Sequence, residues 1–332
     1  MQHDVHVASM TYATVAFSGS VLVDPTVAYI RDPMTNAKKV ATAAGGPTDT
    51  STGMVSCLKA LPQNQFQKAQ LTIVQIPVNA AFGFVVDHDN IQDLPLRALQ
   101  QTLDSGYTGP KYYHQLSARR CLFNINFVGT VVPDVLNSAP LTFRAIRNVI
   151  TKYLLPRDAR PLCPIPDTHL GDRVIQHYNM SEHDRRKPFS DKFYRPASDA
   201  IQGYPAAKEA LMYAKHAWPS GPSVQLIRTI YDSHYKGWGA FHAMELAYIF
   251  GQWQLFPGEK YDPRLTVSYR SMLSQVAHKG RMDGPAFLQS NSAYGVNELG
   301  LDGQWSASTY DLAGMLNYWQ DIANQPCPGA FK

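Results

Sequence analysis

Charged side chains are scarce in this sequence of 332 residues. They make up 17% of the chain, below the ~25% of average soluble proteins. Lys and Arg together number 30 against 26 Asp and Glu, which gives a formal net charge of +4. Basic residues gather closely only at Arg185-Arg186-Lys187, just after Glu182 and Asp184. Because nucleic-acid-binding proteins carry a basic patch or stripe, we expect a solvated loop here and no nucleic-acid partner.

A membrane-spanning run is also missing near the N-terminus. Residues 5–23 carry no Lys, Arg, Asp or Glu, but seven of these 19 residues are His, Ser, Thr or Gly. That polarity is too high for a transmembrane helix, and no positively charged segment precedes it as in a secretory signal. We expect a buried helix followed by a strand, no membrane span, and leave the cellular compartment unknown.

Motifs for metals, nucleotides and cofactors are absent. The chain has no G-x-G-x-x-G, P-loop, H-E-x-x-H or EF-hand pattern, and no two histidines are four residues apart. Its four cysteines form no C-x-x-C pair, and their three possible pairings stay open; they are Cys57, Cys121, Cys163 and Cys327. We therefore predict no cofactor and no metal. The G-x-S-x-G nucleophile elbow and an H-G-G-G oxyanion loop are missing as well.

What is present is material for one large mixed fold. Hydrophobic residues make up 45% of the chain, which excludes a disordered class, and Gly and Pro are dispersed without a period. Apolar, β-branched runs predict strands, at 15–23, 71–78, 121–132 and 224–231. Because predicted helices alternate with these strands, the sequence predicts an α/β layered fold.

The predicted helices each show one apolar face. The faces comprise Met54, Cys57, Leu58 and Leu61; Phe143, Ile146, Val149, Ile150 and Tyr153; Ala207, Ala210, Leu211 and Ala214; and Leu312, Met315, Leu316, Trp319 and Ile322. Ser308 is the candidate cap of the last helix. The Pro-, Asp- and Arg-rich residues 155–188 predict a long loop.

The densest local signal is the segment 239–251, GAFHAMELAYIFG, which follows the predicted strand 224–231. A histidine in a small-residue turn between strand and helix would present its imidazole at a sheet edge, where it could shuttle a proton. From spacing alone, a hydrogen-bonded His242 without a catalytic role is the favoured interpretation. Trp238 and Phe241 flank His242 and could line a substrate pocket, while core packing explains them as well. Glu245 is interpreted as orienting a backbone turn.

Six stretches together resemble type-B carboxylesterases, the cholinesterase-like family of α/β-hydrolases. The segment His242–Gly251 resembles the family's histidine motif H-G-x-E-L-x-Y-V-F-G. Five others occur in the family's order: Phe17–Ser20 (Q-S-G-S), Val55–Pro62 (C-L-R-x-L-P), Phe82–Asp89 (F-G-P-V-x-D-G-D), Phe193–Ala197 (F-x-C-P-A) and Tyr318–Ala323 (Y-W-x-N-F-A).

The resemblance implies an α/β-hydrolase fold, here truncated at the N-terminus, with residues 1–332 as a single partial domain. It makes His242 the histidine of a serine–carboxylate–histidine triad and a small ester the substrate. The family's elbow and oxyanion loop have no counterpart in the 332 residues, and Val128 stands where the family places its glutamate. We therefore expect an inactive chain.

Two alternatives stay open: a non-catalytic binding or adhesion module, which Val128 favours, and a truncated product without function. The resemblance names no protein partner, and the family's frequent secretion does not fix the compartment of this chain.

Overall fold

The computed structural model describes residues 13–17, 33–73, 95–105, 112–118, 168–180, 195–196, 198–215, 223–231, 240, 244–252, 261–287 and 294–325. The chain divides into two compact units. The first comprises Met1–Val23, Pro95–Phe123 and Pro140–Lys332, and the second comprises Asp24–Leu94 and Asn124–Ala139. That residues 1–332 form a single partial domain stays a prediction.

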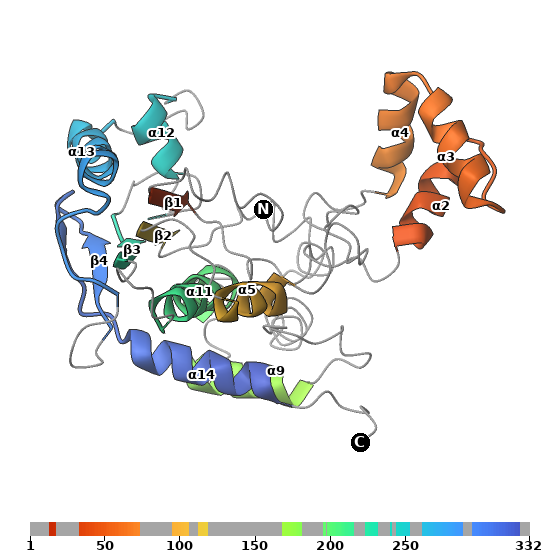
Figure 1. Ribbon diagram of the computed structural model, residues 1–332. Helices are drawn as coiled ribbons and strands as arrows, with labels where there is room; N and C mark the ends of the chain where they lie inside the picture. The colour runs from red at the N-terminus through yellow and green to blue at the C-terminus, as the bar shows by residue number, and fades with distance from the viewer. Residues whose placement is uncertain are drawn as a thin grey trace. The chain divides into compact units, whose positions relative to one another are not determined.

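A five-stranded mixed sheet is the centre of the first unit (Figure 1). Its strands follow chain order, β1 (Ala13–Phe17), β2 (Tyr112–Ala118), β3 (Ser223–Thr229), β4 (Val296–Leu299) and β5 (Trp305–Ala307). The first four strands are parallel, and β5 returns antiparallel to β4. In register, Tyr112 pairs with both Ala13 and Ser223, and Leu226 pairs with Val296.

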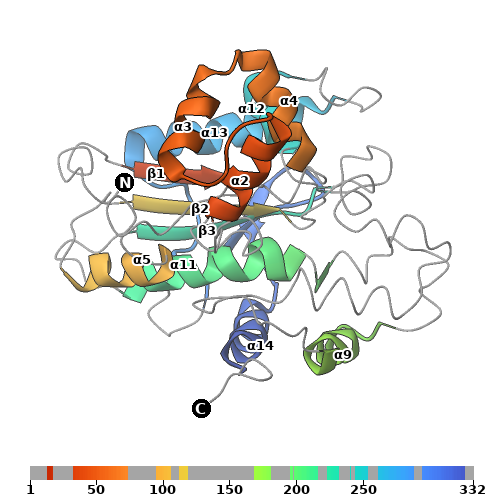
Figure 2. The ribbon, with the colours of Figure 1, turned by 90° about the vertical axis from the view of Figure 1, so that its right-hand side faces the viewer.

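The described residues of the first unit also form helices. They are α5 (Pro95–Asp104), α9 (Thr168–His177), the π-helical turn η3 (Asp199–Gly203), α11 (Tyr204–Lys215), α12 (Met244–Phe250), α13 (Pro263–Lys279) and α14 (Leu312–Asn324). Helix α11 packs on β2 and β3, and α14 packs on α11. Helices α12 and α13 pack together on the opposite side of the sheet (Figure 2).

The side chains of β3 show why two helical layers are needed. Successive residues of a strand point to opposite faces. On one face, Gln225 bonds both backbone groups of Met282, which follows α13, and Thr229 bonds Tyr269 of α13. On the other face, Leu226 is buried and Arg228 forms an ion pair with Glu298. Because both faces of β3 are covered, its polar residues Gln225 and Thr229 are buried together with its apolar ones.

The second unit contains three helices, α2 (Pro33–Ala43), α3 (Ser51–Ala60) and α4 (Gln63–Ile73). Helix α2 packs against both α3 and α4. Helix α3 begins where the Thr50 hydroxyl accepts the Gly53 N–H at 3.1 Å. Cys57 carries a free thiol, and the other three cysteines lie outside the described residues.

Several predicted elements are confirmed. The strand predicted at 224–231 is β3, and the apolar faces predicted from Met54, Ala207 and Leu312 belong to α3, α11 and α14. The strand predicted at 15–23 overlaps β1, which begins two residues earlier, while the residues after Phe17 lie outside the described part. The same holds for the strand predicted at 121–132 and the helix predicted around Phe143.

Three predictions are wrong. Leu71–Ile73 complete α4 and begin no strand, because the helical spacing of Phe66, Ala69 and Ile73 continues through them. The predicted loop 155–188 contains α9, in which Leu170 and Val174 are buried one turn apart. The cap of α14 is Asp311, whose carboxylate accepts the Gly314 N–H at 2.8 Å, and not Ser308.

Candidate functional site

The predicted site residues His242, Trp238 and Phe241, and Val128 at the expected acid position, lie outside the described residues. Their roles therefore stay predictions. The described chain approaches His242 from both sides, at Ala240, which is buried, and at Met244, where α12 begins. The described residues nearest to His242 are therefore those around the start of α12.

Tyr269 of α13 joins the carboxyl end of β3 to the first turns of α12. Its hydroxyl lies 2.8 Å from the Thr229 hydroxyl, at the last residue of β3. Its ring stacks on Tyr248 of α12, with centroids 6.3 Å apart. Tyr248 and Tyr269 are both fully buried. In open α/β sheets, ligands bind outside the carboxyl ends of the strands, so this is the edge where a site is expected.

Glu245, in the first turn of α12, is a buried carboxyl next to this edge. The residue is only 4% exposed. Burial raises the pKa of its carboxyl to about 7, and a hydrogen bond from the backbone of Glu245 itself offsets this rise only in part. Burial and the nearby Glu245 both raise the pKa of Tyr269. A carboxyl in this setting takes up or loses a proton near neutral pH, three residues after His242.

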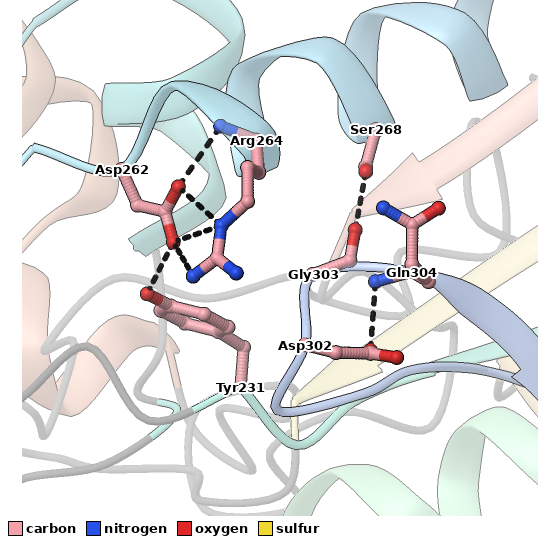
Figure 3. A network of polar contacts seen from close by, with 7 residues as sticks. All are labelled: Tyr231, Asp262, Arg264, Ser268, Asp302, Gly303 and Gln304. Carbon is pink, nitrogen blue, oxygen red and sulfur yellow. Dashed lines mark hydrogen bonds and ion pairs between the residues drawn. The ribbon is translucent and has the colours of Figure 1, made fainter.

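A second polar group lies where β3 ends and α13 begins (Figure 3). Asp262 caps α13 by accepting the Arg264 N–H at 2.9 Å, and it also binds the Arg264 guanidinium at 2.6 Å. The Tyr231 hydroxyl donates to the same carboxylate at 2.7 Å. The Arg264 hydrogen bonds lower the pKa of Asp262 to about 2, while burial and Asp262 raise that of Tyr231 to about 12.

The same close-up shows how the turn after β4 is fixed to α13. The Ser268 hydroxyl donates to the Gly303 carbonyl, and Asp302 accepts the Gln304 N–H at 2.9 Å (Figure 3). Gly303 has a positive φ of 75° and lies against the Arg264 and Leu265 side chains. These groups are used in mutual hydrogen bonds. They position the sheet edge, and none is left as a free acid, base or nucleophile.

Metal ligation has no support in the described part of the chain. No group of three or more His, Cys, Asp or Glu side chains there could hold an ion. Among the described helices, none combines the length and apolar character needed to cross a bilayer.

Residues 5–298 match the family model of the carboxylesterase family. The chain belongs to the carboxylesterase family. This confirms the family expected from the six stretches, and the family has the α/β-hydrolase fold. No curated protein matches the sequence. The described residues of this carboxylesterase-family chain are mostly helical around a small mixed sheet.

The match includes the His242–Gly251 motif and four of the five other stretches. It ends at residue 298, within β4, so Tyr318–Ala323 of α14 lies beyond it. The likeness of that helix to the family's terminal helix stays a prediction.

Proposed function

We propose that these 332 residues carry the histidine-bearing part of a carboxylesterase site and do not hydrolyse esters on their own. The observation that carries the proposal is a contrast within one sequence. The family match covers the His242 motif, while no G-x-S-x-G elbow and no H-G-G-G loop occurs anywhere in the 332 residues.

The chemistry of an intact site assigns His242 a definite role. A serine oxygen attacks the ester carbonyl carbon while the imidazole takes the serine proton, and the imidazole then gives that proton to the departing alcohol. Water cleaves the resulting acyl-enzyme by the same proton shuttle in reverse. In this proposal His242 is the shuttle, and Trp238 and Phe241 line the pocket for a small ester.

The edge around α12 supports this placement of His242. Tyr269 links the end of β3 to α12, and α12 begins two residues after His242. An imidazole in the intervening turn would lie near the carboxyl ends of the parallel strands, where sites of α/β folds are built. Glu245 would be close to it and is proposed to orient the turn.

The missing groups decide the activity. Loss of only the carboxylate of a triad lowers turnover by about 10⁴-fold, and loss of the nucleophile by about 10⁶-fold. The rate that remains in such variants depends on the oxyanion hole. With Val128 at the acid position and neither an elbow nor an H-G-G-G loop in the sequence, we expect no turnover above the uncatalysed rate.

A second candidate is a non-catalytic binding module, and Val128 is the residue that favours it. A valine has no group that could fix an imidazole tautomer, which is unimportant for a protein that only binds. This candidate requires a folded chain, so a cooperative melting transition would separate it from a truncated product without function.

Turnover of a p-nitrophenyl ester by the purified chain tests the proposal. We expect the wild type, His242→Ala and the control His278→Ala to release p-nitrophenol at the same, uncatalysed rate. His278 is a suitable control because it lies exposed near the end of α13. Turnover that His242→Ala abolishes and His278→Ala preserves would overturn the inactive assignment.

A further inference from the structure

Asp199, the first residue of η3, is a carboxyl enclosed by side chains from distant parts of the chain. Its Oδ1 accepts a hydrogen bond from the Tyr310 hydroxyl and its Oδ2 one from the Tyr178 hydroxyl, both at 2.9 Å. The Tyr178 oxygen in turn accepts the indole N–H of Trp319 at 2.9 Å. We refer to Asp199, Tyr178, Tyr310 and Trp319 as the Asp199 cluster.

The cluster joins α9 to α14, which lie side by side (Figure 1). Tyr178 directly follows α9, Trp319 is a fully buried residue of α14, and Tyr310 lies just before that helix. The two helices also meet through His177, whose ring stacks on Tyr318 at 3.6 Å. The polar Asp199 cluster thus lies at the contact between α9 and α14, which is otherwise formed largely by aromatic rings.

The cations near Asp199 compensate its charge poorly. Arg195 approaches Oδ2 only to 4.0 Å, and its side chain is 67% exposed, so water screens it. Arg228 is engaged elsewhere: it binds Glu298 at 2.7 Å and lies over the Tyr310 ring at 4.0 Å. Burial therefore raises the pKa of the Asp199 carboxyl, although both tyrosines and both arginines act to lower it.

Within the described residues, the titratable and charged side chains around Asp199 come from α9, β3, β4 and the segments before η3 and α14. They include Tyr178, Arg228, Arg195 and Tyr310, with Glu298 behind Arg228. His177 and the ion pair of Arg173 with Asp321 also lie between α9 and α14, and burial lowers the pKa of His177. Helix α14 itself contributes the indole of Trp319, which does not titrate.

The hydrogens of the cluster can be assigned from its connections. The Tyr178 oxygen accepts from Trp319, so its single hydrogen points to Asp199 Oδ2. The bond between Tyr310 and Oδ1 has no such constraint, because a proton on Oδ1 would be donated to the Tyr310 oxygen instead. The cluster can therefore accept one proton on Oδ1 and keep all three hydrogen bonds.

We propose that the Asp199 cluster is a proton-dependent latch, which fastens α14 to α9 while Oδ1 of Asp199 carries a proton and loosens when that proton is lost. Loss of the proton leaves a carboxylate with no close cation among the described residues at the contact between α9 and α14. Helix α14 lies beyond residue 298, so the latch holds a segment outside the family match. The latch does not depend on whether the chain hydrolyses esters.

The sign of the pH effect follows from the raised pKa of Asp199 in the closed latch. In the open state Asp199 has the ordinary aspartate pKa of about 3.9, and below that pH the proton stabilises the closed latch by its full amount. This stabilisation is lost as pH rises through the higher pKa of the closed state. Between these two values, the equilibrium for opening α14 rises by up to about tenfold per pH unit.

Hydrogen exchange of the full chain between pH 5 and pH 8, followed by mass spectrometry, tests the latch. After correction for intrinsic exchange rates, we expect protection of 312–324 to fall as pH rises. In Asp199→Asn the amide oxygen accepts from Tyr178 and the amide nitrogen donates to Tyr310, so the variant reproduces the protonated latch. Its protection of α14 should stay high and independent of pH.

Two controls complete the experiment. Asp283→Asn removes a carboxylate that is 73% exposed and distant in sequence, and it should behave as wild type. Measuring all variants in a Glu245→Gln background removes a second described carboxyl whose pKa is raised with the same sign. Tyr310→Phe should lower the protection of α14 while its pH dependence remains.

The latch is overturned if the pH dependence in Asp199→Asn equals that of wild type. His177 stacks on Tyr318, and burial lowers its pKa, so its titration acts with the opposite sign and is removed by a His177→Gln background. The latch is equally overturned if protection of 312–324 in that background is constant or increases with pH.

Discussion

Arg228→Met removes the cation from a largely buried ion pair between two neighbouring parallel strands. The Arg228 and Glu298 side chains are 18% and 14% exposed, and their charged atoms are 2.7 Å apart. After the substitution, the Glu298 carboxylate retains the Ser308 hydroxyl as a donor, at 2.8 Å. Removing one member of a buried pair typically costs 3–5 kcal/mol, and the remaining donor favours the lower end. We expect a loss of about 3 kcal/mol in the free energy of unfolding at pH 7.

The partner substitution should be milder. In Glu298→Gln the Arg228 guanidinium keeps its contact with the face of the Tyr310 ring, at 4.0 Å. We expect a loss of about 2 kcal/mol. The double variant Arg228→Met/Glu298→Leu leaves neither charge of this pair unpaired, and replacing a whole buried pair by apolar residues is often neutral. It should lie within about 1 kcal/mol of wild type.

Urea denaturation followed by circular dichroism measures these differences, with the slope of the transition as the check that compactness is unchanged. The reasoning is refuted if Arg228→Met costs less than about 1 kcal/mol, or if the double variant loses the sum of the two single losses.

Two further predictions concern single side chains. Asp311→Ala removes the cap of α14 and should lower the free energy of unfolding by about 1 kcal/mol in urea, while Asp311→Ser should restore most of it; equal stability of Asp311→Ala and wild type would show that another residue caps the helix. Burial raises the pKa of Glu245 from 4.5 to about 7. The stabilisation that its protonated carboxyl provides is therefore fully present below pH 4.5 and is lost as pH rises through 7. Between pH 5 and pH 8 the loss due to Glu245 should reach up to about 3 kcal/mol, and Glu245→Gln should remove this part while the loss due to Asp199 remains. A loss of the same size in that variant would assign the effect to other groups.

The elements that the sequence predicted correctly are those whose local pattern agrees with their tertiary role. The stripe of Leu312, Met315 and Trp319 is buried as a helical face because α14 packs on α11 and contacts the end of α9. Strand β3 was recognised because Val224, Leu226 and Ile227 form a short apolar run with the length of a strand. Local spacing was sufficient for each.

Other elements required tertiary information or a signal that was overlooked. Strand β2, YYHQLSA, has no continuous apolar run, and its pairing with β1 and β3 places it in the sheet. Helix α13 did carry local signals, since Asp262-Pro263 marks its start and Gly280, with a φ of 74°, marks its end.

The Asp199 cluster could not be predicted from spacing at all. Its members are separated by up to 141 residues along the chain, and only the packing of α9 against α14 brings them together. By contrast, the His242 motif is a local pattern, which is why the family could be recognised without a structure. The missing elbow is also visible in the sequence alone, and it bears on activity.

Intact-mass spectrometry after incubation with an excess of fluorophosphonate tests most directly whether this chain has lost its nucleophile. A family esterase treated in parallel shows that the reagent is active. For the folded 332-residue chain we expect an unchanged mass. An added phosphonyl group on one serine, present in wild type and absent in His242→Ala, would contradict the proposal.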